Sequence, residues 1–278
     1  MAGPVGDDPD APEGMDPRHL AVLRAQAHVW KKLADGIRRP WVTMALLATL
    51  VLAHVVVGLV GFSQGGITAA GIIVGDRPTS TLITMGAMYS PRIRLGEVWR
   101  LVSCVFLHGD GMHILLNGIA LYGLGRLCES VYGPARFLWL FLVAGVTGST
   151  LSFIGGNVAS VGASGSIFGL MGACIVFGHR YRLVLPPHIG EIFRKKLMPW
   201  VGLNLMIGFV LPFVDNLGHV GGLLGGAIFA AVASNRIVPA EPNRRETRWV
   251  MGVTSGVLLM GTLVALLWSW VELARQAR

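Results

Sequence analysis

Residues 137–179 read FLWLFLVAGVTGSTLSFIGGNVASVGASGSIFGLMGACIVFGH, and none of these 43 residues is Asp, Glu, Lys or Arg. One crossing of a bilayer needs about 20 consecutive apolar residues, so this run is long enough for two crossings. Glycines and small residues gather between Gly155 and Gly162, where we expect the turn between the two helices. The second helix then begins at Ser164, close to the membrane surface.

Ser164 stands in the motif Gly162-Ala163-Ser164-Gly165. At a helix N-terminus the backbone N–H groups lack intrahelical partners and the helix dipole is positive. Both features favour a nucleophile whose reaction passes through an oxyanion. Small residues also suit close packing of membrane helices, so the motif alone does not distinguish chemistry from packing.

The composition is that of a membrane protein with several spans. Of the 278 residues, 53% are hydrophobic and only 14% are charged, against about 25% charged residues in a soluble domain. The net charge of +8 comes from basic residues between the apolar runs, which is typical of orientation signals and not of a nucleic-acid-binding face. Cys104, Cys128 and Cys174 are far apart in the sequence, so neither a zinc site nor a disulfide framework is indicated.

The apolar runs predict an all-α polytopic fold in three regions. Residues 1–40 are expected to form a largely disordered cytoplasmic tail, and for 19–33 we favour a plain basic flank over an amphipathic surface helix. These residues are mostly polar, so we expect no cleavable signal peptide. Residues 41–235 should hold a six-helix core, and 236–278 a linker and a seventh transmembrane helix. The expected spans are 41–62, 111–127, 137–153, 164–177, 197–213, 218–234 and 249–271.

Lys and Arg orient these spans by the positive-inside rule. They gather before the first span and in the loops after the second, fourth and sixth, whereas the turns after the third and fifth carry none. We therefore expect a cytoplasmic N-terminus, an extracytoplasmic C-terminus and a place in the plasma (cell inner) membrane. The segment after the first span is discordant, since it contains Arg77, Arg92, Arg94 and Arg100, and we expect it to lie partly in the membrane interface.

In this topology the second, fourth and sixth spans all descend from the outer surface. Their first turns carry His113 and Asn117, Ser164, and His219, at depths of roughly 10 Å or less, so these side chains can meet in one shallow site. Small faces allow close approach of the sixth and fourth spans, and they consist of Gly218, Gly222 and Gly226 on one and Gly165 and Gly169 on the other. Such packing brings His219 towards Ser164, with Phe168 against the imidazole.

These side chains suit nucleophilic catalysis. Ser164 needs a base, which His219 supplies, while Asp215 lies in the preceding turn, where we expect it to be solvated. We therefore predict a dyad without a third acid. His113 and Asn117 share one helix face, and their side-chain N–H groups with the Ser164 amide would form an oxyanion hole. Their alternative role is to satisfy one another or to hold helices together.

The remaining histidines are assigned supporting or packing roles. His108 is five residues before His113, and we expect it to support the junction of loop and helix. A metal site built from His108, His113 and His219 lacks a carboxylate or thiolate partner, and HExxH is absent, so we expect no metal and no cofactor. His54, His179 and His188 are expected to be interfacial or packing residues.

Residues 41–235 resemble a rhomboid intramembrane serine protease. The resemblance is carried in order by Trp99-Arg100, His108-x4-His113-x3-Asn117, Glu129 with Gly133, Gly162-Ala163-Ser164-Gly165, and His219-x2-Gly222-x3-Gly226. It implies Ser164 as the nucleophile, His219 as the general base, and oxyanion stabilisation by His113, Asn117 and the Ser164 amide. It implies structural roles for Trp99, Arg100 and Glu129, a membrane-dipping first loop, and a mobile fifth helix with the following turn as a substrate gate. The seventh span resembles the six-plus-one arrangement of some members.

The implied partners are the lipid bilayer and membrane proteins whose transmembrane segments are cut near the outer face. The resemblance suggests a small residue before the scissile bond and helix-destabilising residues after it. The alternative is a non-catalytic rhomboid-like protein that binds transmembrane segments for quality control, but such members lack the Ser or the His. A transporter or channel would place polar residues near the midplane or show an inverted repeat, and neither is found.

Overall fold

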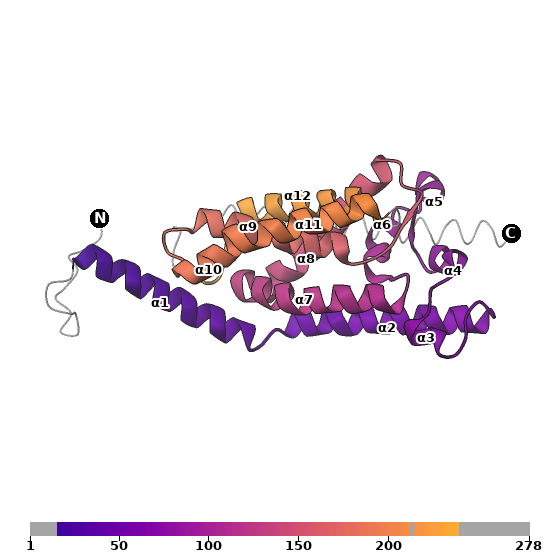
Figure 1. Cartoon of the computed structure of the whole chain (residues 1–278), viewed down its shortest axis with the longest axis horizontal. Coiled ribbons are helices and arrows are strands. Elements are labelled where there is room, and N and C mark those ends of the chain that lie inside the picture. The colour runs from indigo at the N-terminus through magenta and orange to yellow at the C-terminus, as the bar shows by residue number, and fades with distance from the viewer. Residues whose placement is uncertain (1–15, 212–213, 239–278) are drawn as a thin grey trace.

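The computed structural model describes residues 16–211 and 214–238. The start of the expected tail, the last two residues of the expected fifth span, and the whole expected seventh span therefore lie outside the described residues. The described chain is a bundle of helices with one small antiparallel sheet (Figure 1).

The long helices are α1 (Pro17–Ile37), α2 (Trp41–Ser63), α7 (Gly111–Tyr132), α8 (Pro134–Ile154), α9 (Ser164–Arg180), α11 (Leu197–Val210) and α12 (Asn216–Val232). The short elements are α3 (Gly71–Val74), α4 (Thr79–Thr84), β1 (Met88–Tyr89), α5 (Ser90–Arg94), α6 (Arg100–Ser103), a 3-10 turn (Cys104–Phe106), β2 (Ala159–Ser160), α10 (Pro187–Glu191) and a π turn (Ile192–Lys196). Most short elements lie in the long connection between α2 and α7.

The apolar runs form helices suited to a bilayer. Within the described residues, three helical segments are long and apolar enough to cross a membrane: Arg18–Ser63, Gly111–Tyr132 and Pro134–Ile154. Leu197–Val210 and Asn216–Val232 are shorter apolar helices. The prediction of a mostly helical polytopic membrane protein is confirmed, although the described chain also contains a two-stranded sheet that the prediction of an all-α fold did not include.

The uncharged run divides where its glycines predict. α8 ends at Ile154 and α9 begins at Ser164, with β2 in the turn between them. α7 is longer than expected and continues to Tyr132, past the charged Arg126 and Glu129. Gly133 then joins α7 to α8 directly: its φ is +78°, a conformation that favours glycine, and Pro134 starts the next helix.

The segment before the first span is a helix, which corrects two expectations for residues 17–37: the disordered tail and the plain basic flank. Val29 and Leu33 are fully buried, and Gly36 lies against Ser130 of α7. Trp30 meets the ring of His188 edge-on, with centroids 5.2 Å apart. Residues 17–37 form a stable helix because their apolar side chains pack in the bundle, where α1 contacts α7. The local sequence does not show that this packing partner exists.

Helices α12, α9 and α8 form the tightest part of the bundle, while α2 and α1 pack on α7. The core between them contains large buried side chains, among them Leu121, Phe137, Phe141, Leu170 and Phe177. α7, α9 and α12 begin at the same end of the bundle, next to the connection that carries α3 to α6 (Figure 1). This shared end is where the candidate site lies.

Candidate active site

The first turns of α9 and α12 bring Ser164 and His219 into contact. Ser164 Oγ lies 2.9 Å from Nε2 of His219, which is hydrogen-bonding distance. The imidazole stacks on the ring of Phe168, with the centroids 4.2 Å apart and the planes 9° from parallel. His219 is only 8% exposed, whereas Ser164 is half-buried. The pair is therefore held in one orientation and remains reachable from one side.

The contact depends on how closely α9 and α12 approach. A Cβ at Gly222 would lie 2.6 Å from the carbonyl carbon of Gly165, and closer still to its oxygen. Gly226 meets Gly169 one turn further on in the same way. Backbone therefore packs on backbone here, because small residues remove the side chains that would hold the helices apart.

His113 and Asn117 lie over Gly162, beside the serine. A Cβ at Gly162 would be 2.6 Å from Nε2 of His113 and 3.7 Å from Nδ2 of Asn117. Gly162 also has a φ of +125°, in the region that favours glycine. Nδ2 of Asn117 is buried and has no hydrogen-bond partner among the described residues. An unpaired donor beside a nucleophile suits the stabilisation of a negative charge that develops there.

His108 packs edge-on against His113, with ring centroids 5.0 Å apart. It is fully buried, and burial lowers its pKa to about 3, so the ring is neutral at physiological pH. Asp110 caps α7 by accepting a hydrogen bond of 2.7 Å from the backbone N–H of His113. Among the described residues, no group of three His, Cys, Asp or Glu side chains is arranged to hold a metal ion.

Asp215 is only half-exposed and not fully solvated as expected, because its carboxylate accepts hydrogen bonds from the start of α12, from α8 and from the turn after α8. It caps α12 by accepting from the Gly218 N–H at 2.8 Å, and it also accepts from Ser152 Oγ and from Asn157 Nδ2. Nδ1 of His219 is buried and has no hydrogen-bond partner within the described chain. Asp215 thus positions the start of α12 and does not orient the imidazole.

A cavity of about 20 Å³ lies beside Ser164. Ser149, Ser160 and Asp215 line it, together with Val105, Val161 and the backbone of several glycines. A polar space of this size is enough for one water molecule. A water molecule therefore has room next to the Ser164 hydroxyl.

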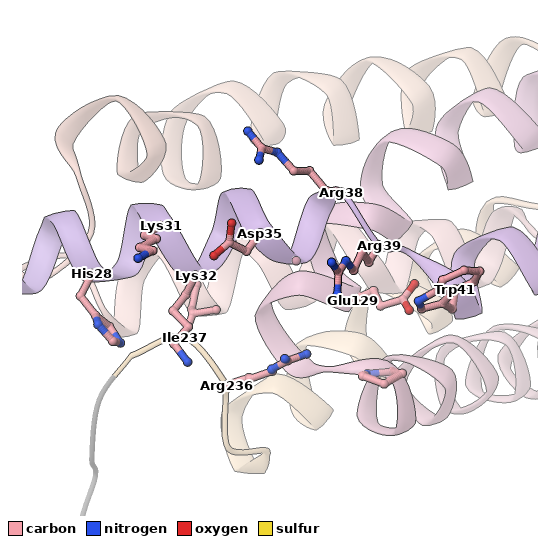
Figure 2. Close-up of a pocket in the computed structure, with 12 residues that line it drawn as sticks. His28, Lys31, Lys32, Asp35, Arg38, Arg39, Trp41, Glu129, Arg236 and Ile237 are labelled. Atoms are coloured by element: carbon pink, nitrogen blue, oxygen red, sulfur yellow. The ribbon is translucent and has the colours of Figure 1, made fainter.

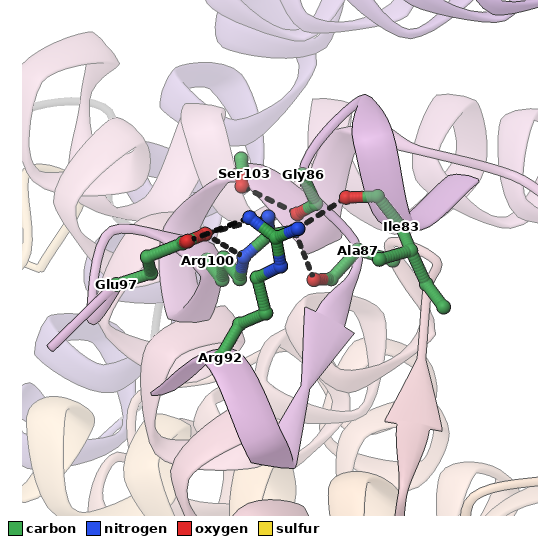
Figure 3. Close-up of polar contacts among 7 residues, drawn as sticks. All are labelled: Ile83, Gly86, Ala87, Arg92, Glu97, Arg100 and Ser103. Atoms are coloured by element: carbon green, nitrogen blue, oxygen red, sulfur yellow. Dashed lines mark hydrogen bonds and ion pairs between the residues drawn. The ribbon is translucent and has the colours of Figure 1, made fainter. Parts of the chain in front are cut away.

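The connection between α2 and α7 holds the segment that leads to Ser164. β1 pairs with β2 through Met88 with Ser160 and Tyr89 with Ala159, and the N–H of Gly162 donates to the carbonyl of Cys104 at 2.9 Å. Arg100 organises this connection: its guanidinium binds Glu97 at 2.6 Å and donates to the carbonyl oxygens of Ile83 and Ala87 (Figure 3). Trp99 stacks on the same guanidinium at 4.7 Å.

Two of the discordant arginines are internal. Arg77 is 5% exposed and donates to Nε2 of His54 at 2.7 Å and to the carbonyl oxygens of Gly71, Ile72 and Gly75. Arg100 is 3% exposed, and Arg92 pairs with Glu97 at 3.0 Å. Arg100 is therefore paired with a carboxylate inside the fold, whereas Arg77 donates from its terminal nitrogens to carbonyl oxygens and to His54, and its buried Nε has no partner among the described residues. Both arginines are held inside the protein, which explains why this segment departs from the charge pattern of the other loops. The role of His54 as the partner of Arg77 was missed, because nothing in the local sequence joins the two residues.

Glu129 lies at the far end of α7, away from Ser164. Its carboxylate accepts hydrogen bonds from the backbone N–H groups of Val42 and Thr43 and from the Thr43 hydroxyl, at 2.9, 2.8 and 2.7 Å. It therefore caps the N-terminus of α2 from another helix. Sequence reasoning also missed that Cys128 and Cys174 meet, with their buried sulfur atoms 3.4 Å apart.

Comparisons with known proteins agree on one family. A model of the Rhomboid domain matches residues 95–236, which contain every site residue predicted from the sequence. Rhomboid protease GluP of Bacillus subtilis (strain 168) is 40% identical over 159 residues, 57% of this chain and 30% of the Bacillus protein. RHOMBOID-like protein 5 of Arabidopsis thaliana is 39% identical over 152 residues, 52% of this chain and 47% of the plant protein. RHOMBOID-like protein 1 of the same plant is 33% identical over 211 residues, 66% of this chain and 51% of that protein. The chain thus spans between about a third and a half of these relatives.

Proposed function

This chain belongs to the rhomboid family, and from that premise we propose that it is an intramembrane serine endopeptidase that cleaves transmembrane segments of other membrane proteins near the outer face of the bilayer. The observation that carries the proposal is the 2.9 Å contact between Ser164 Oγ and Nε2 of His219. A nucleophile within reach of its base is the minimum that acyl transfer requires.

In this proposal, Ser164 Oγ attacks the scissile carbonyl carbon while His219 takes the hydroxyl proton at Nε2. The carbonyl electrons move onto oxygen, and the oxyanion accepts hydrogen bonds from the Ser164 amide, His113 and Nδ2 of Asn117. When the C–N bond breaks, His219 returns the proton to the leaving amine and an ester to Ser164 remains. Water then attacks the ester while His219 takes a proton from it; when the bond between the acyl carbon and Oγ breaks, His219 returns the proton to Oγ, which releases the carboxylic acid and restores the serine.

The site works as a dyad in this mechanism. Nδ1 of His219 has no acceptor within the described residues, so no carboxylate is available there to stabilise an imidazolium. The stacked ring of Phe168 holds the orientation of the imidazole in place of a third acid, and Asp215 only caps α12. Gly162, Gly165, Gly222 and Gly226 supply the close backbone approaches, while His108, Trp99, Arg100 and Glu129 act as supporting residues.

Substrate access is assigned to α11 and the turn that follows it. A substrate helix has to leave the lipid, unwind locally and expose a carbonyl to Ser164. α11 carries large exposed apolar side chains, including Trp200, Met206, Phe209 and Val210, which suits a helix between lipid and substrate. We take this helix as the gate.

The remaining assignments follow the charge pattern. We place residues 41–235 in a six-helix protease core of the plasma (cell inner) membrane, with the N-terminus in the cytoplasm. Residues 236–278 add a seventh span, so the C-terminus is extracytoplasmic. Arg77 and Arg100 lie inside the protein. They therefore do not act as exposed basic residues on the outer side, which supports this orientation under the positive-inside rule.

Labelling with a fluorophosphonate tests the proposal most directly. The full-length protein in detergent should be labelled at Ser164, the Ser164→Ala variant should not, and His219→Ala should label far more slowly. In proteoliposomes, both variants should fail to cleave a transmembrane reporter while still accumulating in the membrane.

A non-catalytic binder of transmembrane segments is the alternative function. It would retain the reporter helix in a pull-down but show neither labelling nor cleavage in the unmodified chain. That combination would reject the protease, and so would full activity of either variant.

A further inference from the structure

A second polar cavity lies at the opposite end of α7 from Ser164. Its volume is about 830 Å³, and its lining comes from α1, the start of α2, the end of α7 and the segment after α12 (Figure 2). Cavities of several hundred Å³ are the usual size for sites that hold a small organic group. Nothing in the proposed protease chemistry uses this cavity.

The lining is strongly basic. Lys31, Lys32, Arg38, Arg39 and Arg236 contribute five cationic side chains, against the two carboxylates of Asp35 and Glu129. Glu129 is already engaged, because its oxygens accept three hydrogen bonds from the first turn of α2. Among the residues that the structure describes, none of the five cations forms an ion pair or a side-chain hydrogen bond.

These cations come from segments that are distant in the sequence. Four of them follow one another on α1 and the short link to α2, and Arg236 arrives from beyond α12, where its backbone N–H donates to the carbonyl of Val131 at 2.7 Å. Like charges gathered around one space repel each other, and an anion in that space would relieve the repulsion. Guanidinium groups in particular match the oxygens of a phosphate.

The cavity lies at the N-terminal end of the apolar helix α2. Trp41, the first residue of α2, lines the cavity and is 77% exposed, and α2 belongs to a segment suited to crossing the membrane. Exposed tryptophans at the end of a span favour the level of the lipid headgroups. An anion that reaches this cavity laterally is therefore one that is already attached to a lipid.

We propose that this cavity binds the headgroup of an anionic phospholipid, with Arg39 and Arg236 as ligands of its phosphate and Arg38 contributing charge at the rim (Figure 2). The lipid is drawn from the leaflet on the side of α1, which is the cytoplasmic leaflet in the orientation proposed above. Basic clusters next to spans attract anionic lipids with about 1 kcal/mol for each Lys or Arg near the surface.

The full-length protein, reconstituted in phosphatidylcholine vesicles, tests the site with small amounts of spin-labelled phosphatidylglycerol or spin-labelled phosphatidylcholine. The motionally restricted fraction of each label gives its relative association constant. The variants are Arg38→Gln/Arg39→Gln and, from a different segment, Arg236→Gln. The matched control is Lys195→Gln/Lys196→Gln, which removes two charges from an exposed basic segment that does not line the cavity.

We expect the unmodified protein to bind phosphatidylglycerol in preference to phosphatidylcholine, and the ratio of the two association constants to fall by about 30-fold in the Arg38/Arg39 variant, which lacks two of the cations. Arg236→Gln should lower it as well, and the control should leave it unchanged. Equal losses in the control and in the cavity variants would overturn the proposal in favour of diffuse surface charge. Displacement of the labelled lipid by inorganic phosphate at constant ionic strength would identify a site for soluble anions and would also overturn it. If the double variant does not fold, Arg236→Gln decides between these outcomes.

Discussion

Substitution of Gly222 by alanine should separate the two residues of the proposed dyad. Gly222 is one turn after His219, and its backbone packs on Gly165, the neighbour of Ser164. A Cβ at Gly222 would lie 2.6 Å from the carbonyl carbon of Gly165, whereas ordinary contacts begin at 3.4 Å. The helices must therefore move apart by at least 0.8 Å at this point, because both partners are backbone and neither can rotate away.

This shift is large compared with the tolerance of a hydrogen bond. Added to the 2.9 Å between Ser164 Oγ and Nε2 of His219, it gives about 3.7 Å, at which the hydrogen bond is lost. Misplacing catalytic groups by about 1 Å costs roughly 100-fold in rate, and we expect kcat for reporter cleavage to fall by about that factor. Overpacking should also lower the free energy of unfolding by about 1–3 kcal/mol.

The assay compares reporter cleavage in proteoliposomes with the rate of fluorophosphonate labelling at Ser164. Gly123→Ala is the matched control, because Gly123 is a helical glycine with nothing within 4 Å of its added Cβ. The control should cleave at the unmodified rate. If Gly222→Ala also cleaved and labelled at that rate, the close contact of α9 and α12 would not be what positions the dyad, and the reasoning would be refuted.

Three further predictions concern other parts of the molecule. Gly162→Ala forces an L residue to a φ near +125° and places its Cβ 2.6 Å from Nε2 of His113, so reporter cleavage should fall by about 100-fold through loss of an oxyanion donor. Glu129→Gln weakens the cap of α2, and the thermal unfolding midpoint in detergent should drop to match a loss of about 2 kcal/mol, with cleavage per folded molecule unchanged. A reporter fused after Arg278 should give an extracytoplasmic signal, because the proposed seventh span would return the chain to the outer side.

Each of these has an outcome that contradicts it. Unmodified cleavage by Gly162→Ala would mean that His113 need not lie over this glycine. Glu191→Gln, on an exposed glutamate, is the control for Glu129→Gln, and equal midpoints for the two variants would exclude the capping role. A cytoplasmic signal from the C-terminal reporter would remove the seventh span or reverse the orientation.

The helices of the core were predictable because their pattern is local. An uncharged run of known length, interrupted by small residues, predicts both α8 and α9, and the structure begins α9 at Ser164. The contact of Ser164 with His219 follows from depth and glycine spacing, since parallel helices with small faces pack closely at equal depth. The catalytic roles of these residues are predictions that the labelling experiment tests.

The predictions for residues 17–37 and for the end of α7 were wrong, because the structure of both segments depends on contacts with residues far away in the sequence. Residues 17–37 are helical because Val29 and Leu33 bury themselves against α7, and α7 continues past Leu127 because Glu129 finds the first turn of α2, 86 and 87 positions away in the sequence.

The sequence by itself determined which segments are apolar enough to leave water, how long they are and how deep their polar residues lie, because those properties depend only on consecutive residues and on the thickness of a bilayer. Only the tertiary structure decided which groups the buried arginines contact, such as His54 for Arg77 and Glu97 for Arg100, and which cations are gathered around one cavity. The physical reason is that hydrogen bonds and charge interactions act over a few ångströms in space between groups that the chain brings together from far apart.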